Sequence, residues 1–150
     1  MIDLILVPVD GSAHANAAVD FASELAAKFG SKLILFNVIS RLGSDHVPEG
    51  LQSYVELEHV HLTERDVLQS VANQIVANAE KRARAHGATK IETVATTGDP
   101  ADSIVELAKK QNVSLITMGR RGLGGLKGLL LGSVSLKVSQ LAECPCMTVP

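Results

Sequence analysis

The chain has 150 residues, a net charge of −2 at pH 7, 46% hydrophobic residues and a mean hydropathy of +0.21. This size and composition predict one compact domain that spans residues 1–150. Aromatic residues make up only 3% of the chain, and its lysines and arginines are dispersed, which argues against a nucleic-acid-binding surface. No stretch has the length of a membrane span or the features of a secretion signal, so we expect a cytoplasmic protein without membrane insertion.

The beginning of the chain predicts a strand, a helix and a second strand. Residues 4–9 form an apolar run that is typical of a buried strand. Ser12 is a favourable N-cap for the helix that follows, and Gly30 ends that helix. A second strand is predicted over residues 32–39. The apolar face of the helix is expected to consist of Ala18, Phe21, Ala22, Leu25 and Phe29.

The middle of the chain continues this alternation after a polar, loop-like stretch over residues 40–61. Apolar residues at helical spacing predict a long helix over residues 62–86. Residues 91–97 are expected to form a third strand. Asp99 then serves as N-cap of a helix that has Pro100 at its first position.

The last part of the chain predicts a fourth strand over residues 113–118, a glycine-rich loop, a helix that begins at Ser133, and a fifth strand over residues 146–149. Five strands that alternate with helices predict an α/β fold, a single-domain open five-stranded parallel sheet with helices on both faces. In the strand order 3-2-1-4-5, the winding reverses between the first and fourth strands, and ligands bind at the carboxyl ends of the strands there. Asp10 and Gly119 follow these two strands and are therefore predicted to meet at one crevice.

The glycine-rich loop, GRRGLGGLKGLLLGSVS over residues 119–135, predicts a phosphate site. Gly119 and Gly122 can adopt positive φ and let backbone N–H groups turn toward a ligand without a Cβ in the way. Gly132 precedes Ser133, whose role as N-cap would leave the unpaired amides and positive dipole end of a helix for an anion. Ser133 and Ser135 add hydroxyl groups. A surface loop that binds nothing is the alternative.

Two well-known phosphate motifs are absent from this loop. A P-loop requires a lysine between its last glycine and the Ser or Thr, whereas Gly132 is followed directly by Ser133. A dinucleotide fingerprint requires a third glycine where Lys127 stands. A Walker-type NTPase and a conventional dehydrogenase are therefore not supported.

The glycine spacing resembles that of the nucleotide-binding branch of the universal stress protein family. That branch has the pattern Gly-x-x-Gly, nine residues, Gly-Ser/Thr, and this chain has Gly119 and Gly122, nine residues, then Gly132-Ser133. The resemblance extends over essentially the whole chain. Three further segments are similar to family motifs: Val7-Pro8-Val9-Asp10-Gly11-Ser12, Gly98-Asp99-Pro100 and Cys144-Pro145-Cys146.

The resemblance implies an ATP-binding regulatory or stress-response module with little or no hydrolysis. It implies that Asp10 contacts the ribose or the adenine, and that Pro8, Val9, Val38 and Met118 surround the nucleoside. The triphosphate would be held mainly by backbone N–H groups and two hydroxyls, from Gly119, Arg121, Gly122, Gly132, Ser133, Val134 and Ser135. Mg²⁺ or Mn²⁺ could accompany the ATP. The resemblance also implies a homodimer through the last strand, and a regulatory role would require a protein partner that the sequence does not identify.

Other interpretations stay open. Asp10 could serve only the backbone of its turn, and Arg120 and Arg121 could be solvated loop residues. A slow metal-dependent ATPase or phosphotransferase is a second hypothesis, in which Asp10 is the one nearby candidate for a base. A flavin-binding electron carrier with the same fold is a third.

Two further groups of side chains suggest metal or redox chemistry less directly. His59 and His61 lie near acidic residues, but a His-x-His pair in a polar loop is usually solvated. Cys144 and Cys146 are interpreted as reduced, partly buried thiols, because side chains two residues apart on a strand are splayed and a metal would need further ligands.

Overall fold

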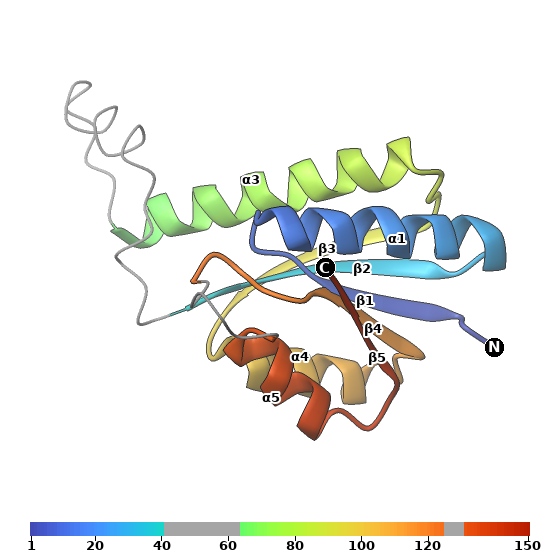
Figure 1. Cartoon of the computed structure of the whole chain (residues 1–150). Helices are drawn as coiled ribbons and strands as arrows, with labels where there is room; N and C mark the ends of the chain where they lie inside the picture. The colour runs from blue at the N-terminus through green and yellow to red at the C-terminus, as the bar shows by residue number, and fades with distance from the viewer. Residues whose placement is uncertain (41–63, 125–130) are drawn as a thin grey trace.

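The computed structural model describes residues 1–40, 64–124 and 131–150. The predicted loop beyond Ser40, and with it His59 and His61, lies outside these residues. The described chain alternates strands and helices throughout (Figure 1): β1 (Leu4–Pro8), α1 (Ala13–Phe29), β2 (Lys32–Ile39), α3 (Glu64–Ala85), β3 (Ile91–Thr97), α4 (Pro100–Lys110), β4 (Leu115–Gly119), α5 (Ser133–Leu141) and β5 (Cys146–Val149).

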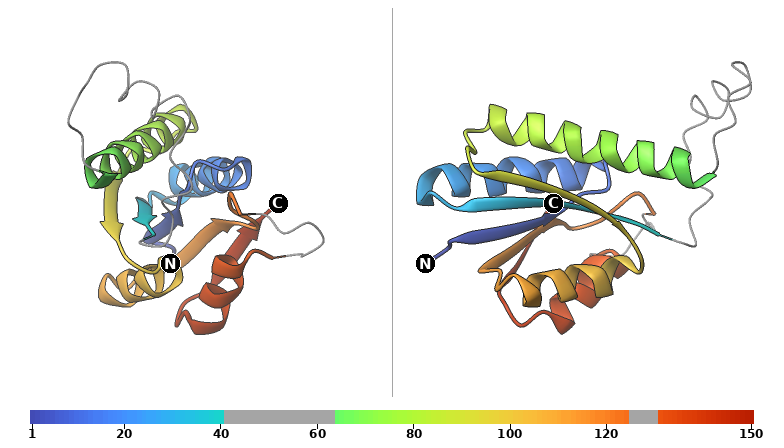
Figure 2. Two further views of the ribbon diagram at one scale, coloured as in Figure 1. Left: turned by 90° about the vertical axis from the view of Figure 1, so that its left-hand side faces the viewer. Right: turned by 180° about the vertical axis from the view of Figure 1, so that it is seen from behind.

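The strands form one parallel sheet in the order β3-β2-β1-β4-β5. Helices α1 and α3 cover one face of the sheet and α4 and α5 cover the other (Figure 2). The predicted single-domain α/β class, strand order and helix placement are thereby confirmed. Because β1 lies between β2 and β4, the carboxyl ends of these three strands meet at one edge of the sheet, where α1 and the glycine-rich loop also begin.

Two apolar cores fill the spaces between the sheet and its helices. Ile5 and Val7 of β1 belong to the core beneath α1 and α3, whereas Leu6 belongs to the core beneath α4 and α5. This alternation follows from the opposite directions of successive side chains in a strand. It explains why the central strands are apolar on both faces and lack a polar alternation.

The buried face of α1 differs from the prediction at its two phenylalanines. Phe21 is 42% exposed and Phe29 is 49% exposed. Successive residues of a helix point in directions about 100° apart, so only one narrow face of α1 lies against the sheet. Small residues line most of this face and allow close approach. These buried residues are Ala15, Ala18, Val19, Ala22, Ser23 and Ala26.

The other element boundaries agree closely with the predictions, and β2, β3 and β5 have the predicted ends. Strand β4 begins at Leu115 rather than at Val113, because the Val113 N–H donates to Ala108 O and so belongs to the end of α4. In the described ranges, no helix combines the length and the apolar character that crossing a membrane requires.

Candidate functional site

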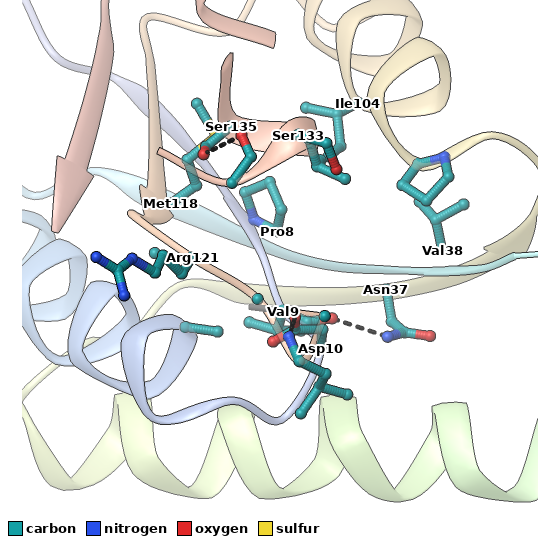
Figure 3. A pocket seen from close by; sticks show the side chains of 18 of the residues that line it. Pro8, Val9, Asp10, Asn37, Val38, Ile104, Met118, Arg121, Ser133 and Ser135 are labelled. Carbon is teal, nitrogen blue, oxygen red and sulfur yellow. Dashed lines mark hydrogen bonds between the residues drawn. The ribbon is translucent and has the colours of Figure 1, made fainter. Parts of the chain in front are cut away.

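A cavity of about 540 Å³ lies at the carboxyl ends of β1, β2 and β4 (Figure 3). Its lining includes every residue that the sequence analysis assigned to the nucleotide site: Pro8, Val9, Asp10, Val38, Met118, Gly119, Arg121, Gly122, Gly132, Ser133, Val134 and Ser135. The fold therefore brings together segments that are more than 100 residues apart in the chain. The contact of each residue with a nucleotide stays a prediction.

The first wall of the cavity is the turn between β1 and α1. Gly11 has φ of +82°, which favours glycine over other residues. Asp10 Oδ1 accepts a hydrogen bond from Ser12 N at 2.9 Å, and Ser12 Oγ accepts one from Ala15 N at 3.2 Å. The chain's own side chains therefore satisfy the beginning of α1.

Asp10 also reaches the opposite wall. Its Oδ2 accepts a hydrogen bond from Leu123 N at 3.2 Å. A Cβ added to Gly122 would lie 2.5 Å from the same oxygen, so a larger residue there would displace the carboxylate. The alternative role of Asp10 in its own turn is thus present in the structure, and the carboxylate links the β1–α1 turn to the glycine-rich loop.

Gly119 and Gly122 of this loop are needed for close approach and not for positive φ. Neither Gly119 nor Gly122 uses the positive φ that glycine can adopt, because among the glycines of the described residues only Gly11, Gly30 and Gly87 have it. A Cβ on Gly119 would lie 2.6 Å from the backbone carbon of His14 and 2.7 Å from Ala15 N. Packing against α1 and Asp10, and not the backbone conformation, therefore sets the requirement for glycine at both positions.

The second wall is the beginning of α5. Gly132 occupies the N-cap with φ of −72° and ψ of 162°, and no side chain caps the helix. The prediction that Ser133 is the N-cap was wrong by one residue: the Gly132 N–H donates to Arg120 O, and Gly132 O accepts from Leu136 N, which starts the helix at Ser133. The N–H groups of residues 133–135 then have no acceptor within the helix.

The two serines of this turn differ in their surroundings. Ser135 is buried, and its Oγ lies 3.0 Å from both Arg120 O and Gly132 O. Ser133 is exposed, and its side chain lies toward Ile104 (Figure 3). Within the described part of the chain, the Ser133 hydroxyl has no hydrogen-bond partner.

The other end of the cavity is apolar. Val38 and Ile104 lie there, whereas Arg121 lies at the opposite side of the cavity, with Met118 beside Ser135 on that side (Figure 3). Pro8 and Pro100 also line the cavity. Pro100 was predicted to begin a helix, but neither it nor Ile104 was assigned to the site from the sequence. The strand order offered a signal for these two residues. The helix that follows β3, α4, lies on the same face of the sheet as α5, so it begins beside the cavity.

Asn37 is a second residue that the sequence analysis missed. It is only 6% exposed, and its Nδ2 donates to Val9 O at 2.8 Å (Figure 3). This bond joins the end of β2 to the residue that precedes Asp10. An amide side chain in the otherwise apolar segment 33–39, next to the carboxyl end of the strand, was the signal that could have found it.

Arg121 lines the cavity, but its guanidinium group lies over the beginning of α1 and points away from Val38 (Figure 3). Its Nε, like that of Arg120, is buried and has no hydrogen-bond partner among residues 1–40, 64–124 and 131–150. Both arginines are partly buried, so the interpretation of them as freely solvated loop residues does not describe this structure.

Ion pairs hold α5 against α4 beside the cavity. Lys137 Nζ of α5 lies 2.9 Å from Asp102 Oδ1 and 3.4 Å from Asp99 Oδ1. Asp99 also caps α4 by accepting from Asp102 N at 2.9 Å. That backbone N–H, with the charge of Lys137, lowers the pKa of the Asp99 carboxyl. The start of α4, which contributes Pro100 and Ile104, is thereby fixed relative to α5.

The candidate metal and redox groups do not form a centre in the described residues. Cys144 and Cys146 are free and partly buried, as predicted, and burial raises the pKa of both thiols. In the ranges that the structure describes, no three His, Cys, Asp or Glu side chains are arranged to hold a metal ion.

Comparison with known proteins gives one consistent family. The model of the universal stress protein family matches residues 1–150. Universal stress protein YxiE of Bacillus subtilis is 35% identical over 157 aligned residues, which cover 99% of this chain and 99% of that protein. The solved structure of a universal stress protein in complex with cAMP is 28% identical with a TM-score of 0.71, over 99% of this chain and 96% of that one. The structure of hypothetical protein MJ0577 is 26% identical with a TM-score of 0.76, over the same shares of the two chains. The chain therefore belongs to the universal stress protein family.

Proposed function

We propose that this protein binds ATP in the cavity and acts as a nucleotide-dependent regulatory module. The observation that carries the proposal is the uncapped beginning of α5 at one side of a cavity whose other end is apolar. Free amides and the positive end of a helix dipole favour an anionic group such as a phosphate. An apolar compartment with few polar groups favours a flat base.

The geometry suggests how the ligand would be oriented. The phosphates would lie at the amides of residues 133–135, with the exposed Ser133 hydroxyl beside them. The base would lie among Pro8, Val38 and Ile104. Asp10 stands between the two walls, and its Oδ2 retains a lone pair beyond the one that accepts from Leu123 N, so it is suited to a ribose hydroxyl. The homologous structure with cAMP supports an adenine nucleotide as the ligand class.

A regulatory role follows from the position of the glycine-rich loop in this proposal. The loop joins β4 to α5 and is held to the first wall by the Asp10–Leu123 hydrogen bond. A nucleotide between the walls would compete for or reinforce this contact and so alter the surface around the loop. A protein partner or the second copy in a homodimer would sense this change. Strand β5 is an edge of the sheet, and the homodimer through it stays a prediction.

Binding without rapid hydrolysis is the form of the proposal that the site supports. Asp10 is the one carboxylate or histidine that lines the cavity among the described residues. Both of its oxygens accept backbone hydrogen bonds, an arrangement suited to holding the walls together and poorly suited to activating a water. If Mg²⁺ or Mn²⁺ takes part, the ATP phosphates and water would supply most of its ligands. Phosphate release that is lost in Asp10→Asn, while ATP binding persists, would instead support the ATPase alternative.

Isothermal titration of the purified protein with ATP tests the proposal. Wild-type protein should release binding heat, and Gly122→Val should not, because its side chain would overlap Asp10 Oδ2. Gly124→Ala is the matched control, because a Cβ at Gly124 meets no atom within 4 Å, and it should bind like the wild type. Wild-type heat no greater than that of Gly122→Val would dismiss the proposal.

A further inference from the structure

The backbone of Arg120 lies where β4, β5 and α5 meet. Its N–H donates to Val149 O at 2.7 Å, and its carbonyl oxygen accepts from Gly132 N at 2.8 Å. Ser135 Oγ lies 3.0 Å from the same carbonyl oxygen. One residue therefore connects the edge strand to the first turn of α5.

The Ser135 hydroxyl is directed into the protein. The side chain of Ser135 is buried, with the residue only 4% exposed. A hydroxyl has one hydrogen to donate, and both acceptors within reach, Arg120 O and Gly132 O, are backbone carbonyls of the site itself. A phosphate could take this hydrogen only if the hydroxyl gave up its bond to these backbone carbonyls.

We propose that Ser135 is a positioning residue that gives the site its preference for phosphate-bearing ligands. Its hydroxyl anchors the first turn of α5 to Arg120 O, and this anchor holds the amides of residues 133–135 in place for a phosphate. Ser133, which is exposed, makes the direct hydroxyl contact. This inference rests on the proposed nucleotide site and assigns different roles to two serines that the sequence pattern treats alike.

The anchor acts on the phosphate end of the ligand alone. The apolar residues that would hold the base, Val38, Pro100 and Ile104, belong to β2 and α4. The donors to Arg120 O in the described residues, Gly132 N and Ser135 Oγ, both belong to the start of α5. Loss of the Ser135 hydroxyl should therefore weaken the binding of a nucleotide and leave the binding of the nucleoside unchanged. A general loss of folding would weaken the binding of both ligands.

Titrations with ATP and with adenosine test this role in wild-type protein, Ser135→Ala, Ser135→Thr and Ser133→Ala. Ser135→Ala should weaken ATP binding by about tenfold, the effect of one hydrogen bond, and leave adenosine binding within about twofold of wild type. Ser135→Thr keeps the hydroxyl and should restore ATP binding. Equal weakening of ATP and adenosine, or an unchanged ATP affinity in Ser135→Ala, would overturn the inference.

Amide hydrogen exchange in the ligand-free protein distinguishes the roles of the two serines. This measurement requires neither ligand binding nor the threonine variant. Exchange at the Gly132 N–H should become several-fold faster in Ser135→Ala, because Arg120 O loses one of its two donors, and it should stay unchanged in Ser133→Ala. Unchanged exchange in Ser135→Ala would show that the hydroxyl is no anchor and would overturn the inference. If wild-type protein binds no ATP while the exchange result holds, the proposed function fails and the anchor itself stands.

Discussion

Helices α1, α4 and α5 begin at the carboxyl edge of the sheet, and the amides of their first turns differ in whether a side chain caps them. Ser12 caps α1 and Asp99 caps α4 with side-chain oxygens. Helix α5 begins at Gly132 with no side-chain cap. The caps of α1 and α4 stabilise the fold by satisfying backbone N–H groups. Helix α5 instead leaves its first N–H groups available at the cavity.

Contacts outside its first amides hold α5 in place instead. Ser135 anchors the helix to Arg120 O, and Lys137 pairs with Asp99 and Asp102 of α4. The end that would receive a phosphate is therefore fixed without using the N–H groups that a phosphate needs. We expect substitutions at the capped helices to affect stability, and substitutions at the start of α5 to affect ligand binding.

Gly119→Ala should have the largest effect, because Gly119 joins the capped and uncapped walls. Its Cβ would overlap the backbone of His14 and Ala15, which cannot move without displacing α1. We expect a loss of about 3 kcal/mol in the free energy of unfolding, measured by urea denaturation, together with loss of ATP binding. Gly124→Ala is the control and should change neither quantity. A Gly119→Ala protein as stable as the control would show that the two walls are not in close contact.

Ser12→Ala should have an intermediate effect on stability. It removes the hydroxyl that accepts from Ala15 N, and loss of a helix cap costs about 1 kcal/mol. Ser133→Ala at the start of α5 is the matched comparison and should leave the urea midpoint unchanged, because its hydroxyl caps nothing. Equal destabilisation by the two variants would remove the distinction between capped and uncapped helices.

The charge of the Asp99 cap should have the smallest effect, visible as a dependence on pH. The pKa of Asp99 is lowered from its ordinary value of 3.8, chiefly by the hydrogen bond from Asp102 N. Its ionised form is thus favoured in the folded state, so its contribution is present above the ordinary pKa and is lost as pH falls through the lowered pKa. Asp99→Asn retains a capping oxygen without the charge. The difference in urea midpoint between wild type and Asp99→Asn should therefore exist at neutral pH and shrink on acidification below 3.8, and a difference that is constant with pH would contradict this assignment.

Much of the fold could be predicted from the sequence, because local patterns determine it. Continuous apolar runs located the central strands, and the caps Ser12 and Asp99 located the starts of α1 and α4. Phe21 shows the limit of such patterns: helical spacing identifies an apolar face, but only packing against the sheet decides which part of that face is buried.

The residues around the cavity could be gathered from the glycine spacing and the strand order, but their contacts could not. The identity of the N-cap of α5 depends on Arg120 O, and the need for Gly119 depends on the backbone of His14. Both contacts join segments that are separated in the sequence, so a local sequence pattern does not reveal them. The contact of Asn37 was missed for the same reason, because its partner Val9 directly follows the neighbouring strand β1.

The availability of the α5 amides is tested most directly by placing a cap on them. The backbone angles of Gly132 suit an aspartate N-cap, and a Cβ there would lie no closer than 3.5 Å to its nearest neighbour, Arg121 Cα. Gly132→Asp should therefore keep or raise the thermal stability of the protein, and its carboxylate should occupy the free amides and repel a phosphate, which weakens ATP binding by about tenfold or more. Gly132→Ala, which adds no cap, should retain ATP binding. If Gly132→Asp binds ATP as tightly as Gly132→Ala and wild type do, the beginning of α5 is not the phosphate site and the proposed function is contradicted.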